Sequence, residues 1–109
     1  MKYTKQYYIQ YNDKGIMKID KVMAAPVEIE IDVDYYKIKP ELFIYKVGSY
    51  YKLFEANTGL PVASFTRLND MNDFIKNNMD RIIDAVNTLQ NSGKIEKFKH
   101  MLEEYKNNF

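Results

Sequence analysis

The 109-residue chain contains no cysteine and no tryptophan, and it has only four glycines, three prolines and one histidine. The absence of cysteine excludes disulfide bonds, thiolate metal sites and cysteine nucleophiles. With so few glycines, a loop that cradles phosphate groups is difficult to build, and the usual nucleotide-binding, metalloprotease and hydrolase motifs are missing. We therefore expect no catalytic residues, no metal site and no cofactor, and we predict that the protein is not an enzyme.

The sequence also lacks long apolar segments. No stretch approaches the roughly 20 apolar residues of a membrane-spanning helix, and the first residues, MKYTKQYY, lack the apolar run of a signal peptide. Apolar residues make up 46% of the chain, a proportion typical of a folded globular protein. These features predict one domain over residues 1–109, located in the cytoplasm and without a membrane partner.

Charge is nearly balanced over the whole chain, at +1, but it is unevenly distributed along it. Residues 1–26 carry five lysines and two aspartates, residues 27–34 carry four acidic residues, and residues 35–54 carry four lysines and one glutamate. Only Arg67 and Arg81 are arginines among the 16 basic residues. Because arginine is preferred for bidentate contacts to phosphates and bases, a dedicated nucleic-acid-binding protein is less expected.

The first half of the chain has the pattern of an antiparallel sheet. Strands are predicted over residues 7–11, 16–23, 27–34, 42–47, 50–54 and 62–65, and in the first three of them successive side chains alternate between two faces, as in half-buried strands. Turn sequences separate several of these segments, at residues 12–15, 48–49 and 57–59. Residues 24–26, Ala-Ala-Pro, are predicted to interrupt a strand because proline cannot donate to a strand ladder.

The second half changes to a helical period. Apolar residues recur every three or four positions from Leu68 to Leu89, which predicts a helix over about residues 69–91 that ends at Asn-Ser-Gly. The same spacing predicts a shorter helix over about residues 94–107. The expected fold class is α+β, with an antiparallel sheet of about five to six strands (residues 2–65) packed by these two C-terminal helices.

The stretch VEIEIDVDYY, residues 27–36, has the most regular alternation in the chain. It predicts a strand with Val27, Ile29, Ile31 and Val33 toward the core and Glu28, Glu30, Asp32 and Asp34 on the other side. Carboxylates on one strand face lie about 6.5–7 Å apart. This spacing resembles that of phosphates along a nucleic acid strand, but it is too wide for neighbours to share one Mg²⁺ or Ca²⁺. The acidic row is therefore a solvated face or a partner-binding surface, and a cation site is the least expected reading.

Tyrosine is the second unusual feature, with ten copies. The adjacent pairs at residues 7–8, 35–36 and 50–51 should place one ring in the core and one on the surface, because successive strand residues face opposite ways. Exposed tyrosines are enriched at protein interfaces. The predicted partner-binding residues are thus Glu28, Glu30, Asp32, Asp34, Tyr35 and Tyr36, and they suit a partner protein with a basic groove.

Two alternatives remain open. A nucleic-acid-binding accessory protein would use lysines for phosphates and rings for base stacking, with the candidate set Lys37, Lys39, Lys46, Lys52, Tyr50 and Tyr51. A structural or assembly protein would form a homodimer through a sheet edge or the last helix.

The segment YYKLFEANTGLPVASFTRLNDMNDFI, residues 50–75, resembles a unit common in small bacteriophage and mobile-element proteins. In that unit a strand, a Thr-Gly turn, a second strand and an amphipathic helix follow one another. The small size, the absence of cysteine and the AT-rich residue usage also resemble phage-encoded anti-defence proteins, anti-CRISPR proteins among them. The resemblance implies inhibition or adaptation of a host protein by stoichiometric binding, and it assigns no role to individual residues.

Overall fold

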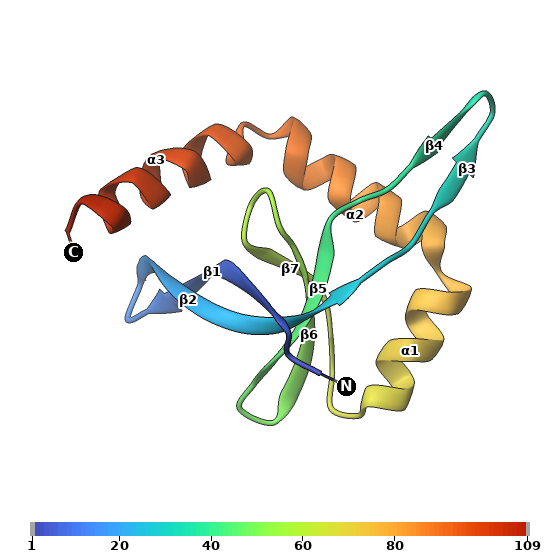
Figure 1. The fold of residues 1–109 in the computed structure, drawn as a ribbon, viewed down its shortest axis with the longest axis horizontal. Coiled ribbons are helices and arrows are strands. Elements are labelled where there is room, and N and C mark those ends of the chain that lie inside the picture. Colours follow the sequence, from blue (N-terminus) through green and yellow to red (C-terminus); the bar gives the residue numbers. More distant parts are fainter. Residues whose placement is uncertain (1, 109) are drawn as a thin grey trace.

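The computed structural model describes residues 2–108, apart from the side chain of Val33. Within this range an antiparallel sheet precedes the C-terminal helices, which confirms the expected α+β class (Figure 1). The strands are β1 (Lys5–Asp13), β2 (Ile16–Val27), β3 (Ile31–Val33), β4 (Tyr36–Ile38), β5 (Leu42–Val47), β6 (Tyr50–Glu55) and β7 (Leu60–Phe65). The helices are α1 (Leu68–Asn77), α2 (Met79–Asn91) and α3 (Lys94–Asn107).

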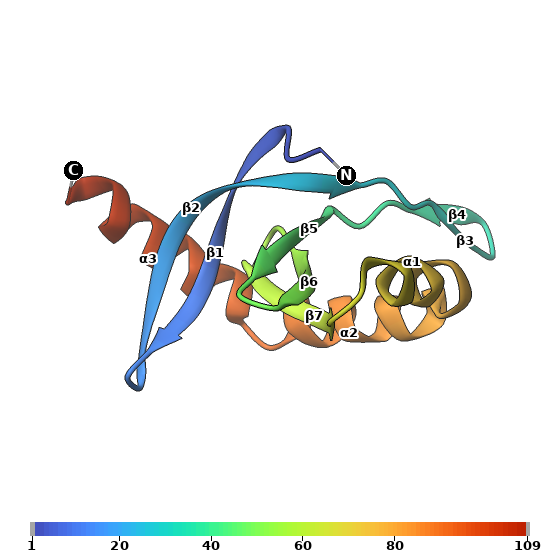
Figure 2. The ribbon, with the colours of Figure 1, turned by 90° about the horizontal axis from the view of Figure 1, so that it is seen from below.

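The main sheet has five strands in the order β1-β2-β5-β6-β7, and each neighbouring pair is antiparallel. Its curvature brings β1 back to the turn between β6 and β7, where the Gln10 backbone N–H donates to the Gly59 carbonyl at 2.8 Å. Figure 2 shows how far the long β1–β2 hairpin bends across the other strands. The sheet is therefore a partly closed barrel rather than a flat layer.

The predicted interruption of the second strand at residues 24–26 is wrong. β2 continues through Pro26 to Val27, pairing with β1 as far as Ala24 and with β5 from Ala25 onward. At Pro26 the strand has β5 as its partner and has already left β1. Pro26 thus occupies an edge position, where the missing N–H is tolerated.

The predicted continuous strand over residues 27–34 is also wrong in part. Residues 28–30 belong to no strand, and β3 and β4 form a separate two-stranded sheet. The turn between them contains Asp34, whose φ of 48° is left-handed. Aspartate tolerates this conformation better than most residues, so the chain can reverse there without glycine.

Two apolar clusters form the core. The first lies between the β1–β2 hairpin and β5–β6, where the Phe43 ring stacks on the rings of Tyr7 and Phe54 at centroid separations of 4.0 and 5.2 Å. The second lies between the sheet and the first two helices, and its buried members are Leu42, Ile44, Leu53, Met71, Ile82 and Val86. The sheet is thus covered on both faces, and the helices cover one of them. Of the four residues predicted to face the core, Ile31 is buried and Val27 and Ile29 are half-buried, whereas the Val33 side chain lies outside what the structure describes.

The helix predicted over residues 69–91 is two helices, α1 and α2, that meet at Asn78. The Asn78 N–H donates to the Phe74 carbonyl at 2.9 Å, and its own carbonyl accepts from Ile82 at 3.1 Å. Asparagine is a weak helix former, so the pair Asn77-Asn78 is a suitable place for the chain to change direction. The last predicted helix is confirmed as α3. No helix within residues 2–108 is long and apolar enough to cross a membrane.

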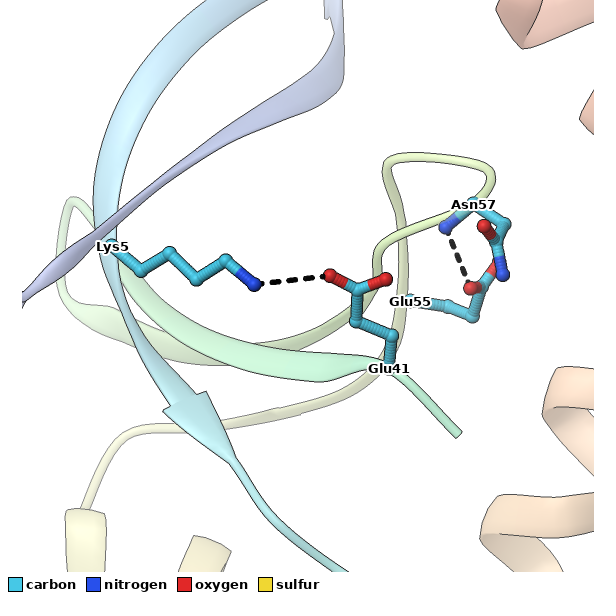
Figure 3. A network of polar contacts seen from close by, with 4 residues as sticks. All are labelled: Lys5, Glu41, Glu55 and Asn57. Carbon is cyan, nitrogen blue, oxygen red and sulfur yellow. Dashed lines mark hydrogen bonds and ion pairs between the residues drawn. The ribbon is translucent and has the colours of Figure 1, made fainter. Parts of the chain in front are cut away.

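The turn between β6 and β7 joins three parts of the fold. Glu55 and Thr58 are fully buried there, and the Gln10 side-chain amide donates to the Thr58 carbonyl at 2.7 Å. The Glu55 carboxylate accepts from the Asn57 backbone N–H at 2.7 Å, close to the exposed Lys5–Glu41 ion pair (Figure 3). Gly59 has a φ of +65°, and atoms of the Phe98 ring in α3 lie 2.7 and 2.8 Å from where a Cβ would stand. The missing side chain of Gly59 therefore makes room for α3.

Candidate functional site

The β3–β4 hairpin extends from the body of the molecule past α2 (Figure 1). Its strands pair only with each other, as in Asp32 opposite Lys37. Tyr35, at the turn, is 101% exposed and Tyr36 is 62% exposed. The expectation that one ring of this pair enters the core is wrong, because the tip of the hairpin lies beyond the packed helices. The expectation fits the pair at residues 7–8 better, since Tyr7 is buried and Tyr8 is half-buried beneath α3.

The four acidic residues of the alternating stretch are all exposed, but they do not form one row. Glu28 and Glu30 line a hollow of about 570 Å³ that also contains Lys5 and Lys39. Glu30 is further neutralised by Lys37, whose ammonium lies 3.2 Å from the carboxylate. The first half of the stretch is thus surrounded by lysines, because the chain bends between β2 and β3.

The same hollow reaches the core at Tyr7, whose ring lies beneath the Lys5 ammonium at 5.3 Å. Burial raises the pKa of the Tyr7 hydroxyl above its usual value; Lys5 opposes this shift and Glu41 adds to it. Three glutamates and two lysines line the hollow, and two of them, Lys5 and Glu41, already pair with each other at 3.4 Å. This region therefore has little net charge to offer a partner.

Asp32 and Asp34 lie in a different setting. They line a hollow of about 370 Å³ together with Asp80 and Asp84 of α2, and the apolar part of its lining is Ile31 and Ile83. The lining contains no basic side chain. We call the following six residues the acidic hairpin surface: Asp32, Asp34, Tyr35, Tyr36, Asp80 and Asp84. Among the residues that the structure describes, no group of three potential ligands is arranged to hold a metal ion.

Asp80 and Asp84 are the residues that sequence reasoning missed. They stand one helical turn apart, a spacing that places two side chains on the same helix face. That spacing is visible in the sequence, but it only indicates a polar face. No local sequence pattern predicts that the hairpin of residues 31–38 lies against the start of α2. The site is therefore a product of tertiary structure.

The fold gathers the lysines of the nucleic-acid alternative only in part: Lys46 and Lys52 line one hollow of about 670 Å³ together with Tyr11 and Tyr45, whereas Lys37 and Lys39 lie elsewhere. Lys37 pairs with Glu30, and Lys39 lines the mixed-charge hollow. In the β5–β6 pair Lys46 stands opposite Tyr51 and Lys52 opposite Tyr45, so the two side chains leave the sheet on opposite faces although both residues border the hollow. The Lys46 ammonium lies 5.2 Å from the Tyr51 ring centroid, and Tyr51 packs on the core.

The candidate tyrosines at residues 50 and 51 are similarly divided, since Tyr50 is half-exposed beside the β5–β6 turn. Lys39 precedes β5 and Lys46 lies near its end, and the extended strand from Leu42 to Lys46 is about 13 Å long. A continuous basic and aromatic patch is thus not assembled from these six residues.

Comparison of the chain with protein-family models, with curated proteins and with solved structures finds no match. Function must therefore be argued from the side chains that the fold brings together. Lys37 stands opposite Asp32 but pairs with Glu30, and none of the four aspartates of the acidic hairpin surface forms an ion pair with another described residue. The exposed Tyr35 follows Asp34 directly in the chain.

Proposed function

We propose that the protein acts by stoichiometric binding to a partner protein with a basic surface, and that the acidic hairpin surface makes the contact. The observation that carries this proposal is a hollow lined by four aspartates and no basic side chain, at a hairpin whose turn exposes two tyrosine rings. A cytoplasmic host protein of defence or nucleic-acid processing, whose basic groove normally receives phosphates, is the kind of partner this surface suits.

Tyr35 supports the proposal because its ring contributes no buried area to the fold. A tyrosine brings a large, rigid contact area to an interface at low entropic cost, and such residues often dominate binding energy. Its position at a hairpin tip lets the ring enter a partner's groove without disturbing the sheet.

The charges support it in a second way. Like-charged carboxylates around one hollow raise the negative potential there, and lysines or arginines of a partner would relieve it. Complementary charge of this kind speeds association and selects against wrong partners, with a range of about 8–10 Å at physiological salt. We therefore expect association that weakens as the salt concentration rises.

A photo-crosslinking experiment tests the proposal. Tyr35 is replaced by p-benzoylphenylalanine in the full chain, which is expressed in its native cells and irradiated, and the crosslinked protein is identified by mass spectrometry. Tyr50, which is also exposed but lies at the far end of the sheet, receives the same replacement as a matched control.

We expect one defined crosslinked partner from position 35, attached through a basic region, and none from position 50. Crosslinking from position 50 alone would contradict the proposal. A complex that contains nucleic acid rather than protein would favour the lysine and tyrosine alternative, and a crosslink between two copies of this chain would favour a homodimer.

A further inference from the structure

A second hollow, of about 560 Å³, lies between the chain that leaves β2 and helix α1. Its apolar lining consists of Ala25, Pro26, Val27, Ile29, Ile44, Leu68, Ile75 and Met79. Polar residues Glu28, Asn72 and Lys76 complete the lining. The side chains of Val27, Ile29, Leu68, Ile75 and Met79 are half-buried, so they have apolar surface left to cover.

This apolar hollow and the acidic hollow adjoin each other. Both are bounded on one side by the segment 25–34, which passes from the first hollow at Ile29 to the second at Ile31. Both are bounded on the other side by the corner between α1 and α2, where Met79 lines the first and Asp80 the second. The molecule thus presents an apolar depression next to an acidic one along a single edge of the fold.

We infer that this edge is a docking groove for a basic amphipathic helix of the partner. Apolar side chains of that helix enter the hollow around Ile75 and Met79, and its lysines or arginines lie against the carboxylates of the acidic hairpin surface. The inference rests on the proposed function and names the chemistry of the partner. An apolar centre beside a charged border is the usual anatomy of a protein interface.

The occupant is a helix rather than a strand because of how the two kinds of surface are arranged. The apolar and acidic hollows follow one another along the segment 25–34 and the α1–α2 corner, so an occupant that crosses this edge must carry apolar and basic residues on neighbouring stripes. A helix does so with apolar residues at every third or fourth position. An extended segment instead turns successive side chains to opposite sides. Charge complementarity requires the polar stripe to be basic.

Synthetic peptides provide the first test. The probe is a 14-residue Leu/Lys peptide with leucines at helical spacing, about 21 Å long when helical. A Ser/Lys peptide keeps the charge but removes the apolar stripe, and a Leu/Glu peptide keeps the stripe but reverses the charge. Binding to the full, isotope-labelled chain is measured by fluorescence polarisation and mapped by amide chemical shifts.

We expect the Leu/Lys peptide to bind and to shift the amides of Asp32, Ile75 and Met79. The Ser/Lys peptide should bind at least tenfold more weakly, because it lacks the leucines whose burial in the apolar hollow favours binding. The Leu/Glu peptide should not bind. Equal affinity for the Leu/Lys and Ser/Lys peptides, or shifts confined to other parts of the chain, would overturn the inference.

A matched pair of variants provides the second test. Asn72→Trp places a large ring in the apolar hollow, and Asn87→Trp puts the same ring on an exposed part of α2 outside the residues that line it. We expect Asn72→Trp to weaken Leu/Lys peptide binding at least tenfold and Asn87→Trp to leave it unchanged. Should Asn72→Trp fold poorly by circular dichroism, Asn72→Arg sets a positive charge at the same position and should also block the peptide.

The Asn72→Trp variant and a second variant, with Asp32 and Asp84 replaced by lysine, separate this inference from the proposed function. If the crosslinked partner loses affinity when Asp32 and Asp84 are reversed in charge but binds Asn72→Trp normally, the acidic hairpin surface remains the contact and the helix groove is refuted. If both variants leave the partner's affinity unchanged, the proposed function fails as well.

Discussion

Two turns of this molecule are opposite in design. At the turn that joins β6 and β7, Thr58 is fully buried and Gly59 lies under the Phe98 ring of α3. At the turn that joins β3 and β4, Asp34 and Tyr35 are exposed, and the Tyr35 ring has no packing at all. Both turns need a left-handed residue, but glycine supplies it in the first and aspartate in the second.

The difference shows how a turn can either hold a fold together or present a surface. Glycine adopts the left-handed conformation without steric cost, and its missing side chain makes space for a helix. An aspartate in the same conformation stores strain, which is more often retained at functional sites than elsewhere. The buried turn thus favours stability, and the exposed turn keeps a charge and a ring where a partner can reach them.

The largest expected effect is at the buried turn. Gly59→Ala should lower the free energy of unfolding by about 3 kcal/mol, because a Cβ would collide with Phe98 and the backbone would be strained. Gly48→Ala is the matched control, since Gly48 has a similar φ of +61° but no atom within 4 Å of a new Cβ. It should cost only about 1 kcal/mol. Urea unfolding of both variants measures the difference.

Equal costs for the two glycine variants would mean that the contact between Gly59 and Phe98 does not hold α3 in place. The turn between β6 and β7 would then not stabilise the packing of α3.

The next effect is on binding. Tyr35→Ala should lower the affinity for the partner at least tenfold, a loss of about 1.4 kcal/mol of binding free energy, because an interfacial tyrosine is truncated. The free energy of unfolding should stay within about 0.5 kcal/mol of the parent protein, as for other exposed positions. Tyr50→Ala serves as the control for binding. A Tyr35→Ala variant that binds normally but unfolds more easily would assign the ring to the fold.

A smaller effect tests the strain at the exposed turn. Asp34→Gly should stabilise the fold by about 0.5 kcal/mol. Glycine relieves the strain of the left-handed backbone, and this gain exceeds the extra conformational entropy that glycine loses on folding. The substitution should also lower the affinity for the partner, because one carboxylate is lost. Lys14→Gly, at a φ of 54° in the β1–β2 turn, should give the same stabilisation with unchanged binding. If Asp34→Gly destabilises the fold, Asp34 has a structural role that its exposure does not suggest.

The smallest effect concerns the core tyrosine that stacks on Phe43. Because burial raises the pKa of Tyr7 in the folded state, its contribution to stability is complete below about pH 10, the usual tyrosine value. That contribution is lost as the pH rises through the higher folded pKa. Tyr7→Phe should therefore unfold less steeply with alkali above pH 10 and behave like the parent protein near pH 7. Identical alkaline unfolding of both proteins would contradict a buried, ionisation-sensitive Tyr7.

Much of the fold can be predicted from the periodicity of apolar residues in the sequence. The alternation from Val27 to Asp32 agrees with the observed burial, and the helical spacing located the apolar faces of the helices. The break at Asn78 and the strand continuing through Pro26 were not foreseeable, because each depends on which element lies alongside. Four of the six residues of the acidic hairpin surface can be proposed from the sequence. Asp32, Asp34, Tyr35 and Tyr36 come from a local pattern, whereas Asp80 and Asp84 join them only through tertiary packing.

The most direct measurement of the central claim is the affinity of the crosslinked partner for two charge-reversed proteins at low and high salt. One carries Asp32→Lys and Asp84→Lys in the acidic hollow. The other carries Asp73→Lys and Glu103→Lys, which make the same change in net charge at exposed positions outside it. We predict at least a hundredfold loss and a reduced salt dependence for the first protein, since each close charge pair is worth about 1.5 kcal/mol or more, and near-parental binding for the second. Equal affinities for the two proteins would contradict the acidic hairpin surface as the site of binding.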